Sequence, residues 1–210
     1  MYGGQPQTIK VVLLGEGRVG KTSLAQRYVR SSFNEGQAAT VQAAFFTKAV
    51  RVQGQEIEVA LWDTAGQEKF HSLGPIYYRD AHAALLVFDI TDTDSFKRVK
   101  RWVDELHAMA GERCQLVIAA NKQDLQHRSV SEEEAQEFAA SQGAAYFQTS
   151  AKTGLGLEEL FTALLSSVLD SLKDQRLHAA QGMQTTGRRH GGLVVASQDS
   201  ISERKSSTCC

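Results

Sequence analysis

Three short runs of apolar residues, each with few polar interruptions, predict strands in this chain. They lie at residues 9–14, 83–90 and 116–120. A strand that is apolar at nearly every position is buried on both faces, which is typical of a parallel sheet covered by helices. The runs therefore indicate a parallel sheet, to which residues 146–149 add one short strand.

A different pattern occupies residues 44–52 and 56–62, where apolar and polar residues alternate. Alternation with a period of two is typical of strands with one buried face. The two segments flank Gln53 and Gly54, a short pair suited to a turn, so they predict an antiparallel hairpin. The expected sheet is therefore mostly parallel with one antiparallel strand.

Helical periodicity separates the predicted strands. Apolar residues recur every three or four positions along residues 96–109 and 157–172, as on the buried side of an amphipathic helix. Ser131 followed by Glu134 forms a capping box, which predicts the start of another helix. Alternating strands and helices predict an α/β fold of three layers, a six-stranded sheet with helices on both faces.

The alternation ends near residue 174, and residues 175–210 differ in composition. They contain five basic and two acidic residues, no aromatic residue, and many Gln, Ser, Thr and Gly residues. Such a segment cannot bury enough apolar area to offset the entropy lost on ordering it. We therefore expect one domain over residues 9–174, a flexible N-terminal segment at 1–8 and a disordered tail at 175–210.

Composition and charge exclude several classes of protein. The chain has 210 residues, 42% of them hydrophobic, with 23 basic and 24 acidic side chains and a formal net charge of −1. This balance argues against a nucleic-acid-binding protein, which would carry a basic surface. Three cysteines cannot form a disulfide framework. No secretory signal and no stretch of about 18 apolar residues is found, so we expect an intracellular protein.

The first candidate site follows the predicted strand at 9–14, where GEGRVGKT (residues 15–22) matches the pattern GxxxxGK followed by Ser or Thr. In this pattern backbone N–H groups curl around phosphate oxygens, and the N-terminus of the next helix, expected at residues 23–29, adds its positive end. Lys21 would reach the β- and γ-phosphates, and the Thr22 hydroxyl would bind Mg²⁺. A glycine-rich turn with a solvated lysine is the alternative. The other residues of the candidate phosphate loop are Gly15, Gly17, Arg18, Val19 and Gly20.

A second motif follows another predicted strand. Asp63 ends the strand at residues 56–62 and begins the sequence DTAGQ. Ligands in open α/β sheets bind at the C-terminal ends of strands. Asp63 can hold Mg²⁺, through a water molecule in our interpretation, and Gly66 would let a γ-phosphate approach the backbone. Taken alone, the motif is also compatible with an ordinary turn.

Two further motifs indicate which base is bound. Asn121, Lys122 and Asp124, in the sequence NKQD, close the predicted strand at 116–120, and the sequence SAK at 150–152 closes the strand at 146–149. A carboxylate can accept hydrogen bonds from both guanine N1–H and the guanine 2-amino group, a pattern that adenine does not offer. The two motifs therefore predict guanine.

Together these motifs resemble the small GTPases of the Ras superfamily, and within it the Rab branch. The resemblance runs from residue 9 to about residue 170, with every nucleotide motif present in order. GEGRVGKTSL and HSLGPIYYRDA are most similar to Rab-twenty-one-like members, which are associated with early endosomes. The other Rab-like sequences are WDTAGQEKF (62–70), YYRDA (77–81), LLVFDIT (85–91) and the terminal Cys-Cys pair.

The resemblance implies a role for each matching residue. Thr40 would complete the Mg²⁺ shell with Thr22 and Asp63, and would contact the γ-phosphate only in the GTP state. Gln67 would orient the attacking water, with Lys21 and Gly66 as the other catalytic residues. Further contacts to the nucleotide would come from Ser23 at the phosphates and, around the base, from Phe33, Asn121, Lys122, Asp124, Ser150, Ala151 and Lys152.

The resemblance also implies slow hydrolysis of GTP and a set of protein partners. Arg18 is the candidate in this chain for an arginine that reaches the γ-phosphate, and we expect it to point into solvent. An arginine supplied by a GTPase-activating protein is worth about 10³–10⁵ in rate. Loss of the γ-phosphate would release the loops that hold Thr40 and Gly66, which effectors read. A guanine nucleotide exchange factor, a GDP-dissociation inhibitor and a Rab escort protein complete the expected partners, and the domain should be monomeric. Phe45, Trp62 and Tyr77 match an aromatic patch for effectors, with core packing as the alternative.

Two other functions are compatible with a phosphate loop. A nucleoside kinase would not need the NKQD and SAK motifs or a lipidated tail. A nucleotide-locked binding module would keep the fold without turnover, although Gly17, Thr40 and Gln67 argue against it.

Cys209 and Cys210 are the last two residues and resemble the double geranylgeranylation site of Rab proteins. Two lipids give stable anchoring where one is marginal, and Arg204 and Lys205 would add about 1 kcal/mol each at an anionic leaflet. Unmodified thiols and palmitoylation are the alternatives. We therefore expect the protein on the cytoplasmic face of intracellular membranes, at early endosomes, cycling with the cytosol.

Overall fold

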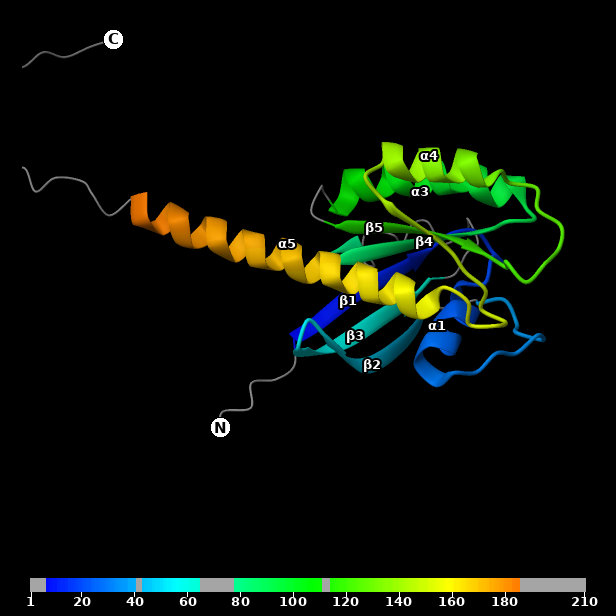
Figure 1. Ribbon diagram of the computed structural model, residues 1–210, viewed down its shortest axis with the longest axis horizontal. Helices are drawn as coiled ribbons and strands as arrows, with labels where there is room; N and C mark the ends of the chain where they lie inside the picture. The colour runs from blue at the N-terminus through cyan, green and yellow to red at the C-terminus, as the bar shows by residue number, and fades with distance from the viewer. Residues whose placement is uncertain (1–6, 41–42, 65–77, 111–113, 186–210) are drawn as a thin grey trace, which may run out of the picture. The chain divides into compact units, whose positions relative to one another are not determined.

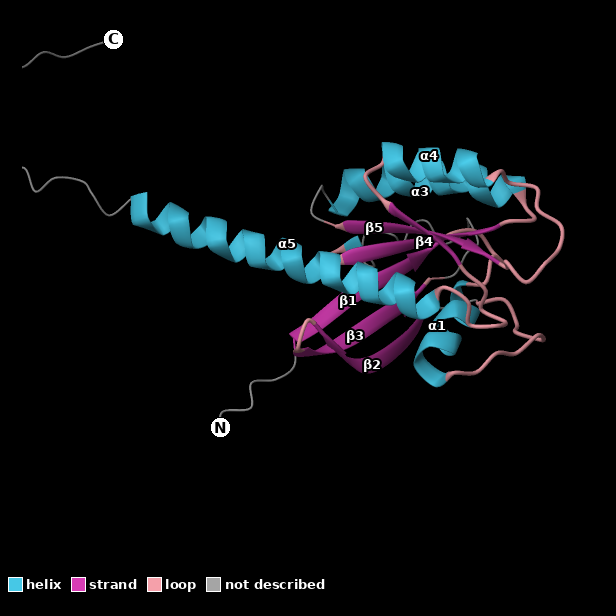
Figure 2. Cartoon of the chain, in the orientation of Figure 1, coloured by secondary structure: helices cyan, strands magenta, loops and turns pink. Residues whose placement is uncertain are grey.

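The computed structural model describes residues 7–40, 43–64, 78–110 and 114–185. Within these ranges every strand and helix expected from the sequence is present (Figures 1 and 2). The strands are β1 (Gln7–Leu14), β2 (Ala44–Val52), β3 (Gln55–Asp63), β4 (Ala83–Asp89), β5 (Gln115–Asn121) and β6 (Ala145–Gln148). The helices are α1 (Lys21–Arg30), α3 (Thr93–Ala110), α4 (Glu132–Ser141) and α5 (Leu157–Thr185).

The strands form one six-stranded sheet in the order β2-β3-β1-β4-β5-β6. Strands β2 and β3 pair antiparallel, with Phe45 opposite Trp62. All other neighbours pair in parallel. The mostly parallel sheet with one antiparallel strand is therefore confirmed, and the C-terminal ends of β1, β3, β4, β5 and β6 meet at one edge.

The side chains of β1 alternate between two hydrophobic cores, one on each face of the sheet. Ile9 and Leu13 pack with the inner sides of α1 and α5. Val12 and Leu14 pack with those of α3 and α4 on the opposite face. Figure 1 shows the same three layers, with α3 and α4 on one side of the sheet and α1 and α5 on the other. Because both faces are covered, the strands are apolar along their length, which explains the continuous runs in the sequence.

The predicted N-terminus of α4 is confirmed by its cap. The Ser131 hydroxyl accepts a 3.3 Å hydrogen bond from the backbone N–H of Glu134. The same hydroxyl donates to the Glu133 carboxylate at 2.6 Å. The first turn of α4 is acidic, which complements the positive end of the helix dipole.

Helix α5 continues beyond residue 174 to Thr185, whereas we expected disorder from residue 175. The chain divides into a compact unit that ends at Lys173 and a second unit that begins at Asp174. Extending an existing helix avoids the cost of nucleating one, so a segment with little apolar area can still be helical. Residues 1–6 and 186–210, which include Cys209 and Cys210, lie outside the described residues.

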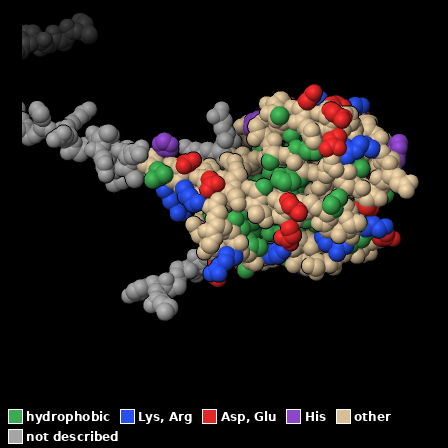
Figure 3. All heavy atoms as spheres, viewed as in Figure 1, with side chains coloured by type: hydrophobic (Ala, Val, Ile, Leu, Met, Phe, Trp, Pro, Cys, Tyr) green, Lys and Arg blue, Asp and Glu red, His purple; other side chains and the backbone are tan. Residues whose placement is uncertain are grey.

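The surface is of mixed charge. Figure 3 shows acidic side chains interspersed with basic ones on one face, in keeping with the near-zero net charge. None of the helices in the described part of the chain is both long enough and apolar enough to cross a membrane.

Candidate nucleotide-binding site

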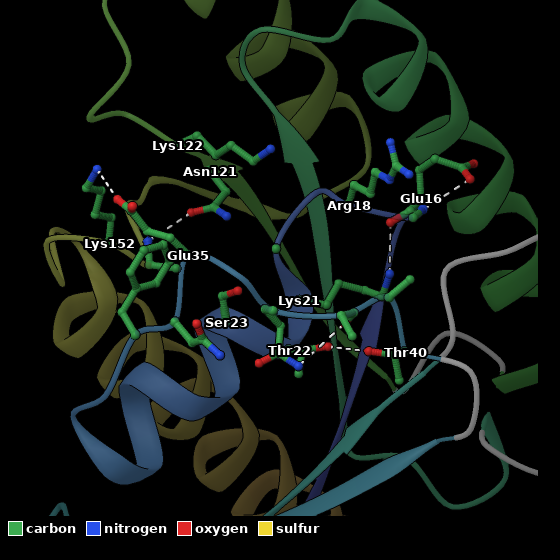
Figure 4. Close-up of a pocket in the computed structure, with 18 of the residues that line it drawn as sticks. Glu16, Arg18, Lys21, Thr22, Ser23, Glu35, Thr40, Asn121, Lys122 and Lys152 are labelled. Carbon is green, nitrogen blue, oxygen red and sulfur yellow. Dashed lines mark hydrogen bonds and ion pairs between the residues drawn. The ribbon is translucent and has the colours of Figure 1, made fainter.

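A cavity of about 800 Å³ lies among the loops that follow β1, α1, β5 and β6 (Figure 4). Its volume is within the range of small-ligand sites, about 300–1,000 Å³. Thirteen of the residues predicted to bind nucleotide or metal line it: Gly17, Arg18, Gly20, Lys21, Thr22, Ser23, Phe33, Thr40, Asn121, Lys122, Asp124, Ala151 and Lys152. The phosphate loop, the NKQD motif and the SAK motif therefore meet at one cavity.

The phosphate loop has a backbone that only glycine fits at two positions. Gly15 has φ +138°, and a Cβ placed there would lie 2.2 Å from the Val87 carbonyl oxygen. Gly20 has φ +100°, and its Cβ would lie 2.5 Å from Nδ2 of Asn121. Arg18 also has a positive φ, of 66°, and its side chain is exposed as expected.

Lys21 lies inside the phosphate loop and is only 5% exposed. Its Nζ donates hydrogen bonds to the carbonyl oxygens of Gly15 at 2.7 Å and Glu16 at 2.9 Å. Burial lowers the pKa of Lys21 to about 8, and the nearby charges of Asp63 and Glu16 oppose this shift. A buried ammonium that donates to backbone carbonyls can exchange these hydrogen bonds for an anion, so it is suited to bind one.

Three predicted metal-binding residues come from three elements and meet at one point. The Thr22 hydroxyl lies 2.5 Å from Oδ2 of Asp63, to which it donates, and 2.6 Å from the Thr40 hydroxyl. Asp63 is fully buried, and within the described ranges its Oδ1 has no hydrogen-bond partner. Burial raises the pKa of the Asp63 carboxyl, although the Thr22 hydroxyl and the Lys21 charge oppose this shift. A buried carboxylate oxygen beside two hydroxyls is a set of hard oxygen donors, which fits Mg²⁺.

Asn121 connects the two ends of the cavity. Its Nδ2 donates a 2.8 Å hydrogen bond to the Val19 carbonyl in the phosphate loop. Its Oδ1 accepts a 3.2 Å hydrogen bond from the Ala151 N–H and a 3.4 Å one from the Thr149 hydroxyl. Asn121 is 1% exposed. Its buried side chain therefore links the loops by hydrogen bonds and is not freely accessible to a base.

Two further residues orient the predicted base-binding side. The Ser150 hydroxyl donates a 2.5 Å hydrogen bond to Oδ1 of Asp124. The Lys122 ammonium pairs with the Asp89 carboxylate at 2.6 Å, and the Lys122 backbone has φ +71°. Ser150 and Val19 do not line the cavity. They contact the lining residues Asp124 and Asn121, respectively.

Several residues of the site were missed by the sequence analysis. Arg27 of α1 donates to the Ala151 carbonyl at 2.8 Å and lies 6.0 Å from the centre of the Phe33 ring. Glu35 pairs with Lys152 at 2.6 Å, on the side of the cavity away from Thr40 in Figure 4. Neither residue belongs to a motif. The only sequence signal is that both lie in the interval bounded by the predicted site residues Ser23 and Thr40.

Some predicted residues lie outside the described part of the chain. These are Gly66 and Gln67 of the DTAGQ motif and Tyr77 of the expected aromatic patch. The other two patch residues are described: Phe45 is 56% exposed and Trp62 is half-buried. Their rings pack edge to face with centres 5.3 Å apart. Core packing therefore does not account for Phe45.

Comparison with known proteins gives the same picture. Residues 10–170 match the family model of the Ras family. The chain is 44% identical over 208 residues to the Ras-related protein Rab-21 of Rattus norvegicus, covering 99% of this chain and 93% of the rat protein. Identity to Rab-21 of Homo sapiens is 44% over 208 residues, covering 99% and 92%. Identity to Rab-21 of Dictyostelium discoideum is 44% over 207 residues, covering 97% of each chain.

Proposed function

The chain belongs to the Ras family as a Rab small GTPase of the Rab-21 type, and on this basis we propose that it is a membrane-anchored, Mg²⁺-dependent switch of endosomal traffic. It is a GTP hydrolase, and its place is in vesicle trafficking. The proposal adds the metal, a slow intrinsic rate, the residue roles, the anchor and the compartment. Its main support is the convergence of Thr22, Thr40 and Asp63 beside the ammonium of Lys21.

The metal would be held by the hydroxyls of Thr22 and Thr40 and, directly or through water, by Asp63. Support comes from the free Oδ1 of Asp63, which is buried with no hydrogen-bond partner within the described ranges. A bound Mg²⁺ would neutralise charge on the β- and γ-phosphate oxygens. Binding would keep the Asp63 carboxyl ionised, against the effect of its burial.

The chain's own groups would position GTP and the attacking water. Lys21 would exchange its bonds to the carbonyls of Gly15 and Glu16 for phosphate oxygens. Backbone N–H groups of the phosphate loop and the N-terminus of α1 would bind the remaining oxygens. Gln67 would orient the water in line with the γ-phosphate. Since positioning and charge neutralisation supply most of the catalysis in phosphoryl transfer, we expect turnover to stay slow until an activating protein adds an arginine.

Guanine would be recognised on the other side of the cavity. Asp124 would accept from N1–H and the 2-amino group through its carboxylate oxygens, while the Ser150 hydroxyl, which donates to Oδ1, holds the carboxylate in place. The Ala151 N–H would turn from Asn121 toward guanine O6. Phe33 would lean on the base, and Lys122, held by Asp89, would lie along it.

The switch would act through the α1–β2 loop, residues 31–43, which holds Thr40. In the GTP state Thr40 would contact both the metal and the γ-phosphate, and loss of that phosphate would release the loop. Hydrogen exchange of the full chain, loaded with GDP or with a non-hydrolysable GTP analogue, tests this directly. We expect protection of residues around Thr40 in the analogue form, and none in Thr40→Ala. Identical exchange in both nucleotide states would contradict the switch.

The proposed attachment and partners are supported by the sequence of the tail and by one exposed aromatic side chain. Two terminal cysteines would take two geranylgeranyl groups, which suits stable anchoring, with the escort protein and GDP-dissociation inhibitor as carriers. Effectors would read the α1–β2 loop together with the exposed ring of Phe45. The Rab-21 relatives support this assignment, and early endosomes are the proposed membrane.

A further inference from the structure

One guanidinium group holds two loops of the nucleotide site together. Arg27 of α1 donates from Nε to the Ala151 carbonyl at 2.8 Å and from one terminal nitrogen to the Lys152 carbonyl. Its other terminal nitrogen donates to the Ser31 carbonyl at 3.1 Å. Ala151 and Lys152 belong to the base-side loop, and Ser31 begins the α1–β2 loop. All three acceptors are backbone atoms, so the contact fixes main-chain positions.

Two of these carbonyls, those of Ala151 and Ser31, lie close in the sequence to groups that would touch the base. The peptide unit on the other side of Ala151 carries the N–H that donates to Asn121 at 3.2 Å. Ser31 is the left-handed C-cap of α1, with φ +53°, two residues before Phe33. The Phe33 ring centre lies 6.0 Å from the Arg27 guanidinium. Arg27 therefore contacts both the residue whose N–H would reach guanine O6 and the ring that would lean on the base.

A second connection between the same loops is weaker. Lys152 and Glu35 pair at 2.6 Å, but their side chains are 53% and 72% exposed, and exposed ion pairs contribute little. Arg27 is half-buried, and its hydrogen bond to the Ala151 carbonyl is partly buried. Its planar fork supplies several donors in fixed directions, which a lysine cannot reproduce. We therefore place the coupling of the two loops on Arg27.

We propose that Arg27 is a positioning residue for guanine, which holds the Ala151 N–H and the Phe33 ring in register and so sets both the lifetime of bound nucleotide and the discrimination at O6. This inference rests on the proposed assignment of the Ala151 N–H to guanine O6. It predicts an effect on recognition of the base that is larger than any general loosening of the site.

The test measures nucleotide release from the full chain in excess Mg²⁺, for GDP and for thioguanosine diphosphate. In the second nucleotide sulfur, a weak acceptor, replaces O6, while N1–H and the 2-amino group are kept. Arg27→Met keeps the aliphatic stem and removes every donor. The matched control is Arg30→Met, because Arg30 lies one turn further along α1, is exposed, and contacts the Phe46 ring at 5.4 Å.

We expect Arg27→Met to release GDP about 10-fold faster than the parent, since hydrogen bonds from a charged donor are lost. The release of thioguanosine diphosphate should accelerate less than that of GDP. The rate of thioguanosine diphosphate release divided by the rate of GDP release should therefore fall several-fold. Arg30→Met should keep both rates within about twofold of the parent. Unchanged GDP release, or equal acceleration for both nucleotides, would overturn the inference.

A second variant keeps the test decisive if Arg27→Met does not fold. Arg27→Lys retains the charge and the stem, and it should give an intermediate loss of discrimination with a melting temperature near that of the parent. A parental ratio of release rates in Arg27→Lys would also overturn the inference. If the parent itself releases both nucleotides equally, the assignment of Ala151 to O6 fails, and with it the proposed function at the base, rather than the role of Arg27 alone.

Discussion

The side-chain amide of Asn121 donates a 2.8 Å hydrogen bond to the backbone carbonyl of Val19, which ties the base-side segment to the phosphate loop. The carbonyl oxygen of the same side chain accepts from the Ala151 N–H. One buried amide thus connects three loops that come from distant parts of the sequence. In the proposed site, the positions of both ends of a bound nucleotide would depend on this side chain.

Replacing Asn121 by Ala should speed the release of GDP. The change leaves the buried Val19 carbonyl without its partner, so the phosphate loop is no longer tied to the base-side segment. A buried polar group left unsatisfied costs about 1–3 kcal/mol. We expect release at least about 10-fold faster than in the parent, followed with a fluorescent GDP analogue. Gln123→Ala, a half-buried side chain in the same segment, is the control and should change the rate little. Parental release by Asn121→Ala would remove this side chain from the binding site.

Gly20→Ala should destabilise the fold and weaken nucleotide binding together. The residue has φ +100°, and its new Cβ would press on Nδ2 of Asn121 at 2.5 Å, which would break the Asn121–Val19 contact. Gly54→Ala is the matched control, because it has φ +76° but nothing within 4 Å of the added atom. Both variants should lose about 1–2 kcal/mol from the left-handed backbone, measured by urea unfolding. Only Gly20→Ala should lose a larger free energy of unfolding than this, and only Gly20→Ala should lose affinity for GDP. Equal losses of unfolding free energy in the two variants would contradict the clash.

The affinity for GDP should fall as pH rises above about 8. Burial lowers the pKa of Lys21 to about 8, and phosphate oxygens in the complex would favour its charged form and raise that pKa. Below pH 8 the ammonium is protonated in both states, so this group adds no pH dependence. Above pH 8 the free protein loses the proton, and binding must take it up again, which lowers the affinity.

Titration of the dissociation constant from about pH 7 to about pH 9 checks this expectation. Lys21→Met is the control, since it retains the titration of the nucleotide itself and of every other group. The difference between the pH dependence of the dissociation constant in the parent and in Lys21→Met is the contribution of Lys21. A constant difference across this range would show that the ammonium keeps its proton in the free protein.

The fold and the motifs could be predicted because their signals are local. The continuous apolar run of β4 and the alternation along β2 report burial on two faces and on one face. The phosphate loop is likewise a contiguous pattern placed between a strand and a helix. Such features depend on neighbours in the sequence, which are visible without coordinates.

The connections among the motifs could not be predicted in the same way. Arg27 and Glu35 contact residues of the base-side loop that lie more than 100 positions away in the sequence, and neither residue type is unusual at a surface. The helical segment from 175 to 185 was missed for another reason. Its composition alone favours disorder, but it continues a helix that is already anchored by packing.

Lipid attachment should depend on Cys209 and Cys210 alone. Full-length protein treated with a geranylgeranyl transferase and an escort protein should gain the mass of two lipids and float with anionic vesicles. Cys209→Ser combined with Cys210→Ser should gain none and stay in solution. Cys114 serves as an internal control, since it is buried and remains in both proteins. Equal flotation of the double variant would contradict the anchor, and one lipid per chain would contradict the double site.

Single-turnover hydrolysis of GTP labelled at its γ-phosphate tests the function most directly. The full-length protein is loaded with GTP, with excess ATP as competitor, with and without Mg²⁺, and Gln67→Leu is measured beside it. We predict bound guanine nucleotide that ATP does not displace, and slow release of phosphate that requires Mg²⁺ and is slower in Gln67→Leu. Tight GTP binding without phosphate release would identify a nucleotide-locked binding module instead, and displacement by ATP would contradict the assignment of Asp124 to guanine.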